Sequence, residues 1–475
     1  MDGIVIGTAA DVASALRTAR AAAAAWRGTQ LRDRLLVIRR TRHLLAARAV
    51  AIAATLDGCR PIADTLTAEI LPLLAGARFL EQRATAILAP HRLRARRPLW
   101  LLGVAAEIRR EPCGVVLVLA PSNYPLFLPG AQILQALVAG NAVCAKPAPG
   151  CAEPLRALSG LLTEAGLPDG LLQVLDESAG TPAAGAGFDR IVLTGSAETG
   201  RRVLAAASET LTPTTMELSG NDPVLVLPNA DLKAVADALS YGLRLNGGAT
   251  CIAPRRIFVS HPQAAALEHA LQARIMMIKP ARIPHRVAVR LDALVAEAVG
   301  QGARLLSGKA RAGHVSPTIL ADATPAMRLL QQDVFAPWLA IVPVAGMAQA
   351  LDALAACPYA LGAAVFGPER EARALAEQIP AGSVCINDLI VPTADPRLPF
   401  GGRGQSGFGV TRGAEGLLEM TVIKTISTRR GRFRPHLAAP QAGDVARYAG
   451  LIELLYGRPA HLLSALRRLV GRSRR

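Results

Sequence analysis

The sequence lacks most features that mark secreted or metal-binding proteins. Its seven cysteines show neither C-x-x-C spacing nor a cysteine–histidine cluster, so we expect no metal site and a reducing cytoplasm. The first residues, MDGIVIGTAADV, hold no basic segment ahead of an apolar run, and we therefore expect no secretory signal there. Aromatic residues make up only 4% of the chain, and lysines are rare among its 53 basic residues.

The basic residues, almost all arginine, give a formal net charge of +17 at pH 7. The excess is concentrated at HRLRARR, residues 91–97, and in the stretch after residue 428. Such a charge raises the hypothesis of nucleic-acid binding, but the sequence contains no RNA-binding or zinc-finger motif. We therefore expect no nucleic-acid partner.

One uncharged stretch, residues 113–145, is long enough for a membrane span. Its interior holds Pro121, Pro125 and Pro129, which a single helix would not tolerate. A buried strand, a loop and a buried helix explain the stretch better. With 475 residues, of which 51% are hydrophobic, the chain is long enough for two or three globular domains.

Apolar periodicity predicts the order of the elements. Residues 10–56 have the spacing of two amphipathic helices, and residues 91–111 form a basic arm or hairpin. From residue 113, short apolar runs alternate with helical stretches, which predicts an open, parallel α/β sheet. We place a first region of N-terminal helices and this sheet over 1–217, a second α/β region over 218–395, a glycine-rich segment over 396–430 and a basic tail over 431–475.

Five short motifs place reactive or ligand-binding groups at the expected ends of strands. LTGSAETG, residues 193–200, joins a strand to a helix, whose free amides and dipole suit a pyrophosphate. Lys146 in AKPAPG ends another strand, where it can reach a ribose or a phosphate. Asn123 in APSNYP can donate to an oxyanion. Glu217 in TMELSG suits a general base, and Cys251 in LNGGATC suits a nucleophile. Taken singly, each motif is weak evidence of function, and for Cys251 and Lys146 alone a structural role is the better explanation.

Taken together and in this order, the motifs are more specific. APSNYP, AKPAPG, LTGSAETG, MELSG, NGGATC, DVFAP and LPFGGRGQSGFG resemble those of the aldehyde dehydrogenase superfamily over roughly residues 10–427. The resemblance implies a Rossmann-like open parallel-sheet cofactor domain, an α/β catalytic domain and a small oligomerisation arm. The arm would comprise residues 396–430, with residues 91–111 as an oligomerisation hairpin, and the protein would form a homodimer or a higher homo-oligomer.

The resemblance also implies roles for single residues. Cys251 matches the nucleophile, Glu217 the base that activates the deacylating water, and Asn123 the oxyanion donor. The residues that match cofactor contacts are Lys146, Gly195, Ser196, Gly200, Asp333 and Phe335, with Ser122 at a position where relatives have tryptophan.

The departures from the family pattern lie mostly on the cofactor side. The glutamate expected three residues after Lys146 is Pro149, which removes a ribose acceptor and a repulsion against a 2′-phosphate. NAD and NADP are therefore both expected cofactors. Asp333 replaces a glutamate, and Ala249 replaces a glutamine two residues before Cys251.

Three functions stay open from the sequence. The first is NAD(P)-dependent oxidation of an aldehyde to a carboxylic acid through a cysteine thiohemiacetal and a thioester. The alternatives are a CoA-dependent acylating dehydrogenase or acyl reductase, and a catalytically weak binding homologue. The apolar segment YPLFLPG favours a hydrophobic aldehyde.

The tail over 431–475 combines apolar helical spacing with five arginines between residues 467 and 475. One interpretation is a helix that packs on a partner subunit. The other is a basic amphipathic segment that contacts anionic lipid. We expect a cytoplasmic protein that is either soluble or peripheral at the inner membrane face.

Overall fold

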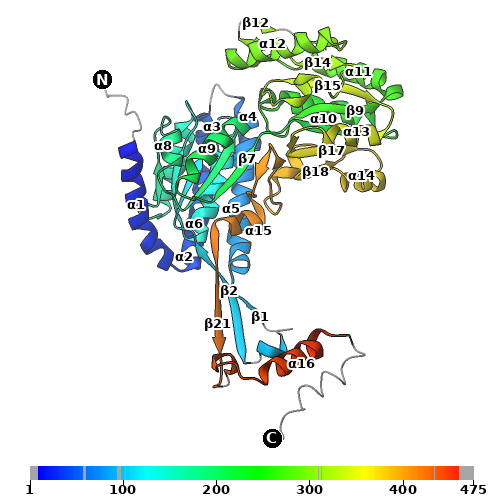
Figure 1. Cartoon of the computed structure of the whole chain (residues 1–475). Coiled ribbons are helices and arrows are strands. Elements are labelled where there is room, and N and C mark those ends of the chain that lie inside the picture. Colours follow the sequence, from blue (N-terminus) through cyan, green and yellow to red (C-terminus); the bar gives the residue numbers. More distant parts are fainter. Residues whose placement is uncertain are drawn as a thin grey trace. The chain divides into compact units, whose positions relative to one another are not determined.

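The computed structural model describes residues 9–56, 60–93, 98–101, 103–308, 310–311, 313–432 and 434–458. It contains two compact units, one formed by residues 1–91 and 108–424 and the other by residues 92–107 and 425–475 (Figure 1). Arg467 and the arginines after it, as well as residues 94–97, lie outside the described residues. The domain boundaries inferred from the sequence stay predictions.

The N-terminal region is helical, but it contains one more helix than the apolar spacing predicted for residues 10–56. Arg48 leaves the helical conformation, with φ −111° and ψ 20°, and its side chain pairs with Glu164 at 2.6 Å. The expected second helix is therefore split in two. The helices before the first sheet are α1 (Ala9–Gly28), α2 (Leu31–Ala47), α3 (Ala49–Ala54), α4 (Ile62–Thr65) and α5 (Leu71–Ile87), with a π-helical turn at Leu66–Ile70.

The first large sheet has the order β20-β7-β6-β3-β4-β5, and all its strands are parallel except β20. The strands are β3 (Val115–Leu119), β4 (Ala142–Lys146), β5 (Leu172–Val174), β6 (Arg190–Gly195), β7 (Thr214–Leu218) and β20 (Gly407–Phe408). The helices that accompany them are α6 (Phe127–Ala139), α7 (Ala152–Glu164), α8 (Gly180–Ala184), α9 (Ala197–Ser208) and α15 (Gly413–Glu419).

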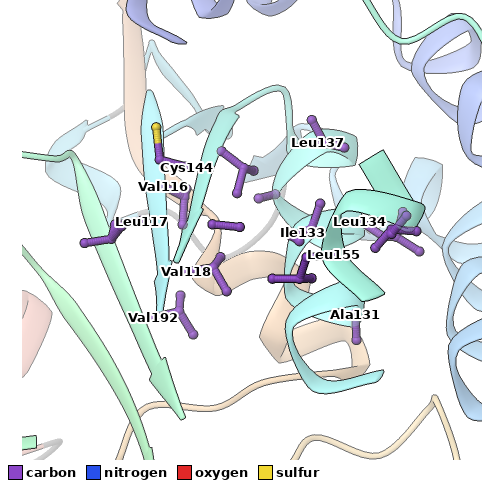
Figure 2. Close-up of a cluster of buried hydrophobic side chains, with 14 of the residues drawn as sticks. Val116, Leu117, Val118, Ala131, Ile133, Leu134, Leu137, Cys144, Leu155 and Val192 are labelled. Carbon is purple, nitrogen blue, oxygen red and sulfur yellow. The ribbon is translucent and has the colours of Figure 1, made fainter. Parts of the chain in front are cut away.

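The core of this sheet explains the uncharged stretch of sequence. Every residue of β3 and α6 is buried, and both elements are uncharged: β3 is apolar throughout, and α6 is apolar except for Gln132 and Gln135. Figure 2 shows Val116 and Val118 of β3 facing the helix that carries Ile133 and Leu134. The helix ends because Gly140 adopts a left-handed conformation with φ 101°.

The strand order creates a crevice at the carboxyl edge of the sheet. From β3 the chain proceeds outward through β4 and β5, then returns to the other side of β3 with β6 and β7. The direction of winding therefore reverses between β3 and β6. In doubly wound folds, ligands bind at the carboxyl ends of the strands beside such a switch point.

The second large sheet has the order β11-β14-β15-β9-β8-β17-β18 and is parallel except for β11. Its strands are β8 (Asp222–Val226), β9 (Pro254–Ser260), β11 (Arg304–Ser307), β14 (Thr318–Ala321), β15 (Trp338–Val344), β17 (Gly362–Phe366) and β18 (Ser383–Ile386). One core contains α10 (Leu232–Arg244) and α11 (His261–Ile275), and a second contains α12 (His285–Gly300), α13 (Met347–Ala355) and α14 (Glu369–Ala376).

The remaining strands form small sheets. β1 (His91–Leu93), β2 (Val104–Pro112) and β21 (Thr421–Arg429) pair in that order, so the segment expected to form a hairpin contains two neighbouring strands. β10 (Ala281–Arg282), β12 (Ala310–Arg311) and β13 (His314–Val315) form another sheet, and β16 (Tyr359–Ala360) pairs with β19 (Arg403–Gly404). The smaller unit also contains α16 (Asp444–Tyr456). Within the described residues, no helix is long and apolar enough to cross a membrane.

Candidate active site

Cys251 and Glu217, predicted from separate motifs, line the same pocket, which has an empty volume of about 650 Å³ when the open space at its mouth is included. Most of its wall is apolar. The other lining residues are Thr67, Ala68, Pro72, Tyr124, Phe127, Leu128, Tyr241, Leu245, Thr250, Ile252, Ile390, Val391, Thr393, Ala394, Phe400 and Arg412. A thiol and a carboxylate therefore face a cavity large enough for a small organic substrate.

The NGG segment before Cys251 forms a turn that most residues could not adopt. Asn246, Gly247 and Gly248 all have positive φ angles, of 50°, 58° and 73°. A Cβ atom at Gly248 would lie 2.4 Å from the Ala336 carbonyl oxygen. The glycines therefore serve a backbone requirement, and the turn presents Cys251 at the end of a short loop.

Burial governs the electrostatics of the thiol. It raises the pKa of Cys251 above the ordinary range, and the carboxylates of Glu217 and Asp222 raise it further. The Arg412 guanidinium acts in the opposite direction. Deprotonation of the Cys251 thiol consequently requires a base, and the Arg412 cation favours the thiolate that forms.

Glu217 is fixed by the glycine-rich segment that follows residue 396. Its strand, β7, pairs with β20 through Glu217 and Gly407. The Thr411 hydroxyl donates a 2.6 Å hydrogen bond to Oε2 of Glu217, whereas Oε1 is buried and has no hydrogen-bond partner. Burial raises the pKa of this carboxyl group, with Arg412 and Thr411 opposing the rise. One carboxylate oxygen is thus held while the other can accept a proton.

Asn123 lies in the loop that carries the pocket residue Tyr124, and its backbone holds the cysteine loop. Its carbonyl oxygen accepts a 2.8 Å hydrogen bond from Nδ2 of Asn246, just before the two glycines. Its side-chain oxygen accepts from the Tyr124 amide at 3.0 Å. The Tyr124 and Thr250 hydroxyls lie 2.6 Å apart. The role of Asn123 as an oxyanion donor stays a prediction.

A buried ion pair beneath this loop is formed by two residues that the sequence motifs did not predict. Arg60 donates to Oε1 of Glu69 at 2.6 Å and to the Asn123 carbonyl at 2.8 Å. Oε2 of Glu69 accepts from the Leu126 and Phe127 amides, each at 2.8 Å. Glu69 is a lone carboxylate in the apolar run LTAEILPLL. This pattern could have predicted the pair, because a buried carboxylate requires a buried partner.

Arg412 was also missed, because the resemblance assigns residues 396–430 to an oligomerisation arm. Its guanidinium carbon lies 4.4 Å from the ring centre of Phe400 and 5.6 Å from that of Phe127. One amino group donates to the Thr393 carbonyl at 2.6 Å, whereas Nε is buried without a partner. The backbone has φ 61°, which is uncommon for a residue with a Cβ atom. The surrounding structure therefore holds a strained, buried cation in the pocket wall.

The predicted cofactor residues lie along the carboxyl edge of the first sheet. Lys146 ends β4 and pairs in register with Leu119 of β3, which itself pairs with Leu193 of β6. Gly195 ends β6, and Ser196 caps α9 by accepting from the Thr199 amide. A Cβ atom at Gly200 would lie 2.9 Å from Leu218, so this glycine lets α9 approach β7. The helix terminus and the lysine fit a dinucleotide, whose pyrophosphate suits the amides and the dipole.

Among the other residues predicted to contact the cofactor, Asp333 is connected by Ser219 to the carboxyl edge of the first sheet. The Ser219 hydroxyl lies 3.3 Å from the Gly195 carbonyl oxygen and interacts with the Asp333 carboxylate. Phe335 is half-buried, and Ser122 is exposed in the loop before Asn123. Their cofactor contacts stay predictions.

Glu177 supplies a carboxylate near the place where Pro149 removes one. Its two oxygens accept from the Gly150 amide at 2.7 Å and from the Ala152 amide at 3.0 Å. Burial lowers the pKa of Lys146, and Glu177 is the first of the charges that oppose this. The family pattern directs attention only to position 149, whereas this carboxylate follows β5.

Among the described residues, no group of three or more histidine, cysteine or acidic side chains could hold a metal ion. Comparison with protein families gives a match to the aldehyde dehydrogenase family over residues 3–426. The chain belongs to this family. It is an NAD(P)-dependent oxidoreductase that converts an aldehyde to a carboxylic acid.

Relatives of similar sequence differ in the aldehyde that they are named for. The chain is 32% identical to a 4,4'-diapolycopene aldehyde oxidase from Methylomonas sp, over 84% of this chain and 78% of that protein. It is 30% identical to a probable coniferyl aldehyde dehydrogenase from Pseudomonas aeruginosa, over 84% of this chain and 86% of that protein.

Solved structures confirm the fold. A Mycobacterium tuberculosis aldehyde dehydrogenase complexed with NAD+ matches with a TM-score of 0.83 and 27% identity, over 89% of this chain and 91% of that one. An NADP-dependent glyceraldehyde-3-phosphate dehydrogenase from Bacillus halodurans, complexed with NADP, matches with a TM-score of 0.83 and 28% identity, over 89% and 92%. The expected arrangement of parallel α/β sheets is thus confirmed, and either cofactor occurs among these neighbours.

Proposed function

We propose that this aldehyde dehydrogenase oxidises apolar aldehydes to free acids, with Cys251 as the nucleophile and Glu217 as the hydrolytic base. The observation that carries the proposal is the shared, mostly apolar pocket of these two side chains. Its preference for apolar substrates is tested by comparing kcat/KM for aldehydes of equal length with and without a terminal carboxylate. A higher kcat/KM for the carboxylate-bearing member of each pair contradicts the proposal.

The proposed chemistry has two halves. The Cys251 thiolate forms a bond to the carbonyl carbon, and the oxygen carries the negative charge, which Asn123 is suited to stabilise. Bound NAD or NADP supplies the hydride acceptor for the oxidation to a thioester. Glu217 then takes a proton from water, the hydroxide attacks the thioester carbon, and breaking the C–S bond releases the acid and the Cys251 thiolate.

We favour hydrolysis over transfer to CoA because Glu217 offers a carboxylate oxygen to water. Thr411 holds Oε2, which leaves the unpartnered Oε1 to accept a proton from water. A product assay with and without CoA separates the two reactions: free acid formed without CoA supports hydrolysis, and reduced cofactor formed only with CoA contradicts it. Loss of turnover in Cys251→Ser would argue against a catalytically silent binding protein.

We further propose NAD as the preferred cofactor. A 2′-phosphate near Lys146 would meet the carboxylate of Glu177 as well as the lysine, whereas ribose hydroxyls can donate to a carboxylate. Comparison of kcat/KM for the two cofactors tests this, and a preference for NADP would contradict it.

We propose a homodimer or higher oligomer in the cytoplasm. β21 is the last strand in its three-stranded sheet, and its residues Val422 and Ile423 are 49% and 62% exposed. Exposed apolar residues on an edge strand favour association with another chain. Light scattering tests this proposal by measuring the molar mass in solution of Ile423→Asp and of the unmodified protein. If both proteins have the same molar mass, β21 has no role in association.

A contact with the membrane is a second proposal, supported by α16. Val445, Tyr448, Ile452 and Tyr456 are exposed and recur at helical spacing, and the arginine-rich end of the chain follows. Flotation with vesicles that contain anionic lipid, with and without residues 431–475, tests it. Equal soluble fractions for both proteins would contradict it.

A further inference from the structure

Arg255, four residues after Cys251, is a buried cation that the sequence motifs did not predict and that the proposed chemistry does not use. It is the second residue of β9, and only 2% of it is exposed. Its guanidinium carbon lies 5.3 Å from the ring centre of Trp338. Burial lowers its pKa to about 10, so the group stays charged at neutral pH. A buried charge is costly unless it is paired or hydrogen-bonded, so the groups that Arg255 binds are informative.

The Arg255 guanidinium donates hydrogen bonds to three main-chain carbonyl oxygens. Nη2 donates to the carbonyl of Gly248, three residues before the pocket thiol. Nη1 donates to the Ala336 carbonyl at 2.6 Å and to the Trp338 carbonyl at 3.1 Å. The planar guanidinium carries several donors in fixed directions, which suits it to acceptors from different parts of the chain.

The first two carbonyls belong to two loops that touch each other. The cysteine loop comprises residues 245–251, and we call residues 333–337 the Asp333 loop. A Cβ atom on Gly248 would lie 2.4 Å from the Ala336 carbonyl oxygen, so the two loops are in contact. Carbonyl oxygens carry partial negative charge, and the cation attracts both of them. Removal of the Arg255 guanidinium would therefore favour separation of the loops.

The Asp333 loop also reaches the crevice that suits a dinucleotide. The Asp333 carboxylate interacts with the Ser219 hydroxyl, which lies 3.3 Å from the Gly195 carbonyl oxygen at the carboxyl edge of the first sheet. Burial raises the pKa of Asp333, whereas the Ser219 hydrogen bond and the Arg255 cation oppose the rise. Arg255 thus acts on the thiol side of the site and on the crevice side at once.

We propose that Arg255 is a positioning residue that holds the cysteine loop against the Asp333 loop, so that the carbon bound to Cys251 meets the hydride acceptor. This inference rests on the proposed function, because it takes Cys251 as the nucleophile and the crevice as the cofactor site. Oxidation requires both loops, whereas hydrolysis of an ester by Cys251 and Glu217 requires no cofactor. A misplacement of about 1 Å between reacting groups can cost about 10² in rate. The two reactions should therefore respond differently to the loss of Arg255.

The first experiment compares aldehyde oxidation with the cofactor-free hydrolysis of p-nitrophenyl acetate. We expect Arg255→Met to lower the first-turnover rate of cofactor reduction by about 10², while ester hydrolysis falls far less. The matched control is Arg34→Met, because Arg34 donates to the Val138 carbonyl at 2.7 Å, near the end of α6. This control should change the two rates equally or not at all.

Unchanged oxidation in Arg255→Met, or equal losses in the two reactions, would overturn the proposal, because a general structural role predicts equal losses. If Arg255→Met does not fold, Arg255→Lys is measured in the same way. Lysine keeps the buried charge but has fewer donors. We expect it to show the same unequal losses at a smaller size, and equal losses would again overturn the proposal.

The second experiment requires no turnover. Hydrogen–deuterium exchange is measured by mass spectrometry over the cysteine loop, the Asp333 loop and α6 in cofactor-free protein. We expect Arg255→Met to speed exchange in both loops and not in α6, whereas Arg34→Met should affect α6 alone. Unchanged exchange, or faster exchange in only one loop or in all three segments, would overturn the proposal. If both loops respond but Cys251→Ser keeps full aldehyde oxidation, the proposed function fails and the contact made by Arg255 stands.

Discussion

Arg60 and Glu69 form an ion pair of 2.6 Å in which the side chains are 2% and 0% exposed. The pair connects the π-helical turn before α5 to the loop of Asn123 and to the start of α6. The ion pair therefore holds the loop of Asn123. The sequence motifs predicted this loop but not Arg60 or Glu69.

Removing one member of this pair should destabilise the protein strongly. Arg60→Met would leave the Glu69 carboxylate buried without its cation, at a cost of about 3–5 kcal/mol. We expect a lower denaturation midpoint for Arg60→Met and for Glu69→Gln. The double variant should lose less than the sum of the two. Additive losses in the double-mutant cycle would contradict direct coupling.

Glu217→Gln should separate the two halves of the proposed reaction. The amide can still accept the Thr411 hydrogen bond but cannot take a proton from water. We expect the turnover rate to fall by about 10²–10⁴ while an acyl group accumulates on Cys251, as measured by mass spectrometry of the quenched enzyme. Thr411→Val serves as the milder comparison, because it releases the carboxylate without removing it. Loss of acylation itself in Glu217→Gln would contradict the assignment.

The pH dependence of kcat should follow from the raised pKa of Glu217. A base must be ionised, so activity is lost as pH falls through this pKa, and burial places that loss above the ordinary range of a carboxyl group. The charged groups that act on Glu217 and Cys251 include Arg412, Asp222 and Asp333. Arg412→Met removes the cation, so we expect its acidic limb to move to higher pH, with recovery in Arg412→Lys. Superimposable pH profiles for all three proteins would contradict this role.

Gly407 should tolerate no side chain. A Cβ atom there would lie 1.9 Å from the Met216 carbonyl oxygen, in the strand that carries Glu217. We expect Gly407→Ala to lower both the melting temperature and the activity. Gly160→Ala, which meets open space inside a helix, should instead stabilise the protein by about 0.5–1 kcal/mol. Equal melting temperatures for the two variants would show that β7 adjusts without cost.

The sequence led to two of the residues that line the pocket, but not to the side chains that hold the pocket together. Cys251 and Glu217 could be found because their motifs occur together in the order that the family resemblance requires, and β3 and α6 because they form long uncharged runs. Arg412 could not, because one of its two aromatic partners, Phe127, is distant in the sequence and no local pattern records a cation between two aromatic rings. The break at Arg48 was missed for a related reason, since apolar spacing continues across it.

Substitution of Glu177 should change the choice of cofactor. Its carboxylate is bound by the Gly150 and Ala152 amides and acts on Lys146, so a 2′-phosphate placed near that lysine would be repelled. Glu177→Gln removes the charge and keeps an acceptor oxygen for one of the two amides. We expect the ratio of kcat/KM for NAD to that for NADP to fall by about tenfold, the equivalent of about 1.4 kcal/mol, mainly through a lower KM for NADP. Asp176→Asn, which changes the neighbouring carboxylate, is the matched control. If both variants change the ratio equally, net charge at this edge decides the cofactor rather than the position of Glu177.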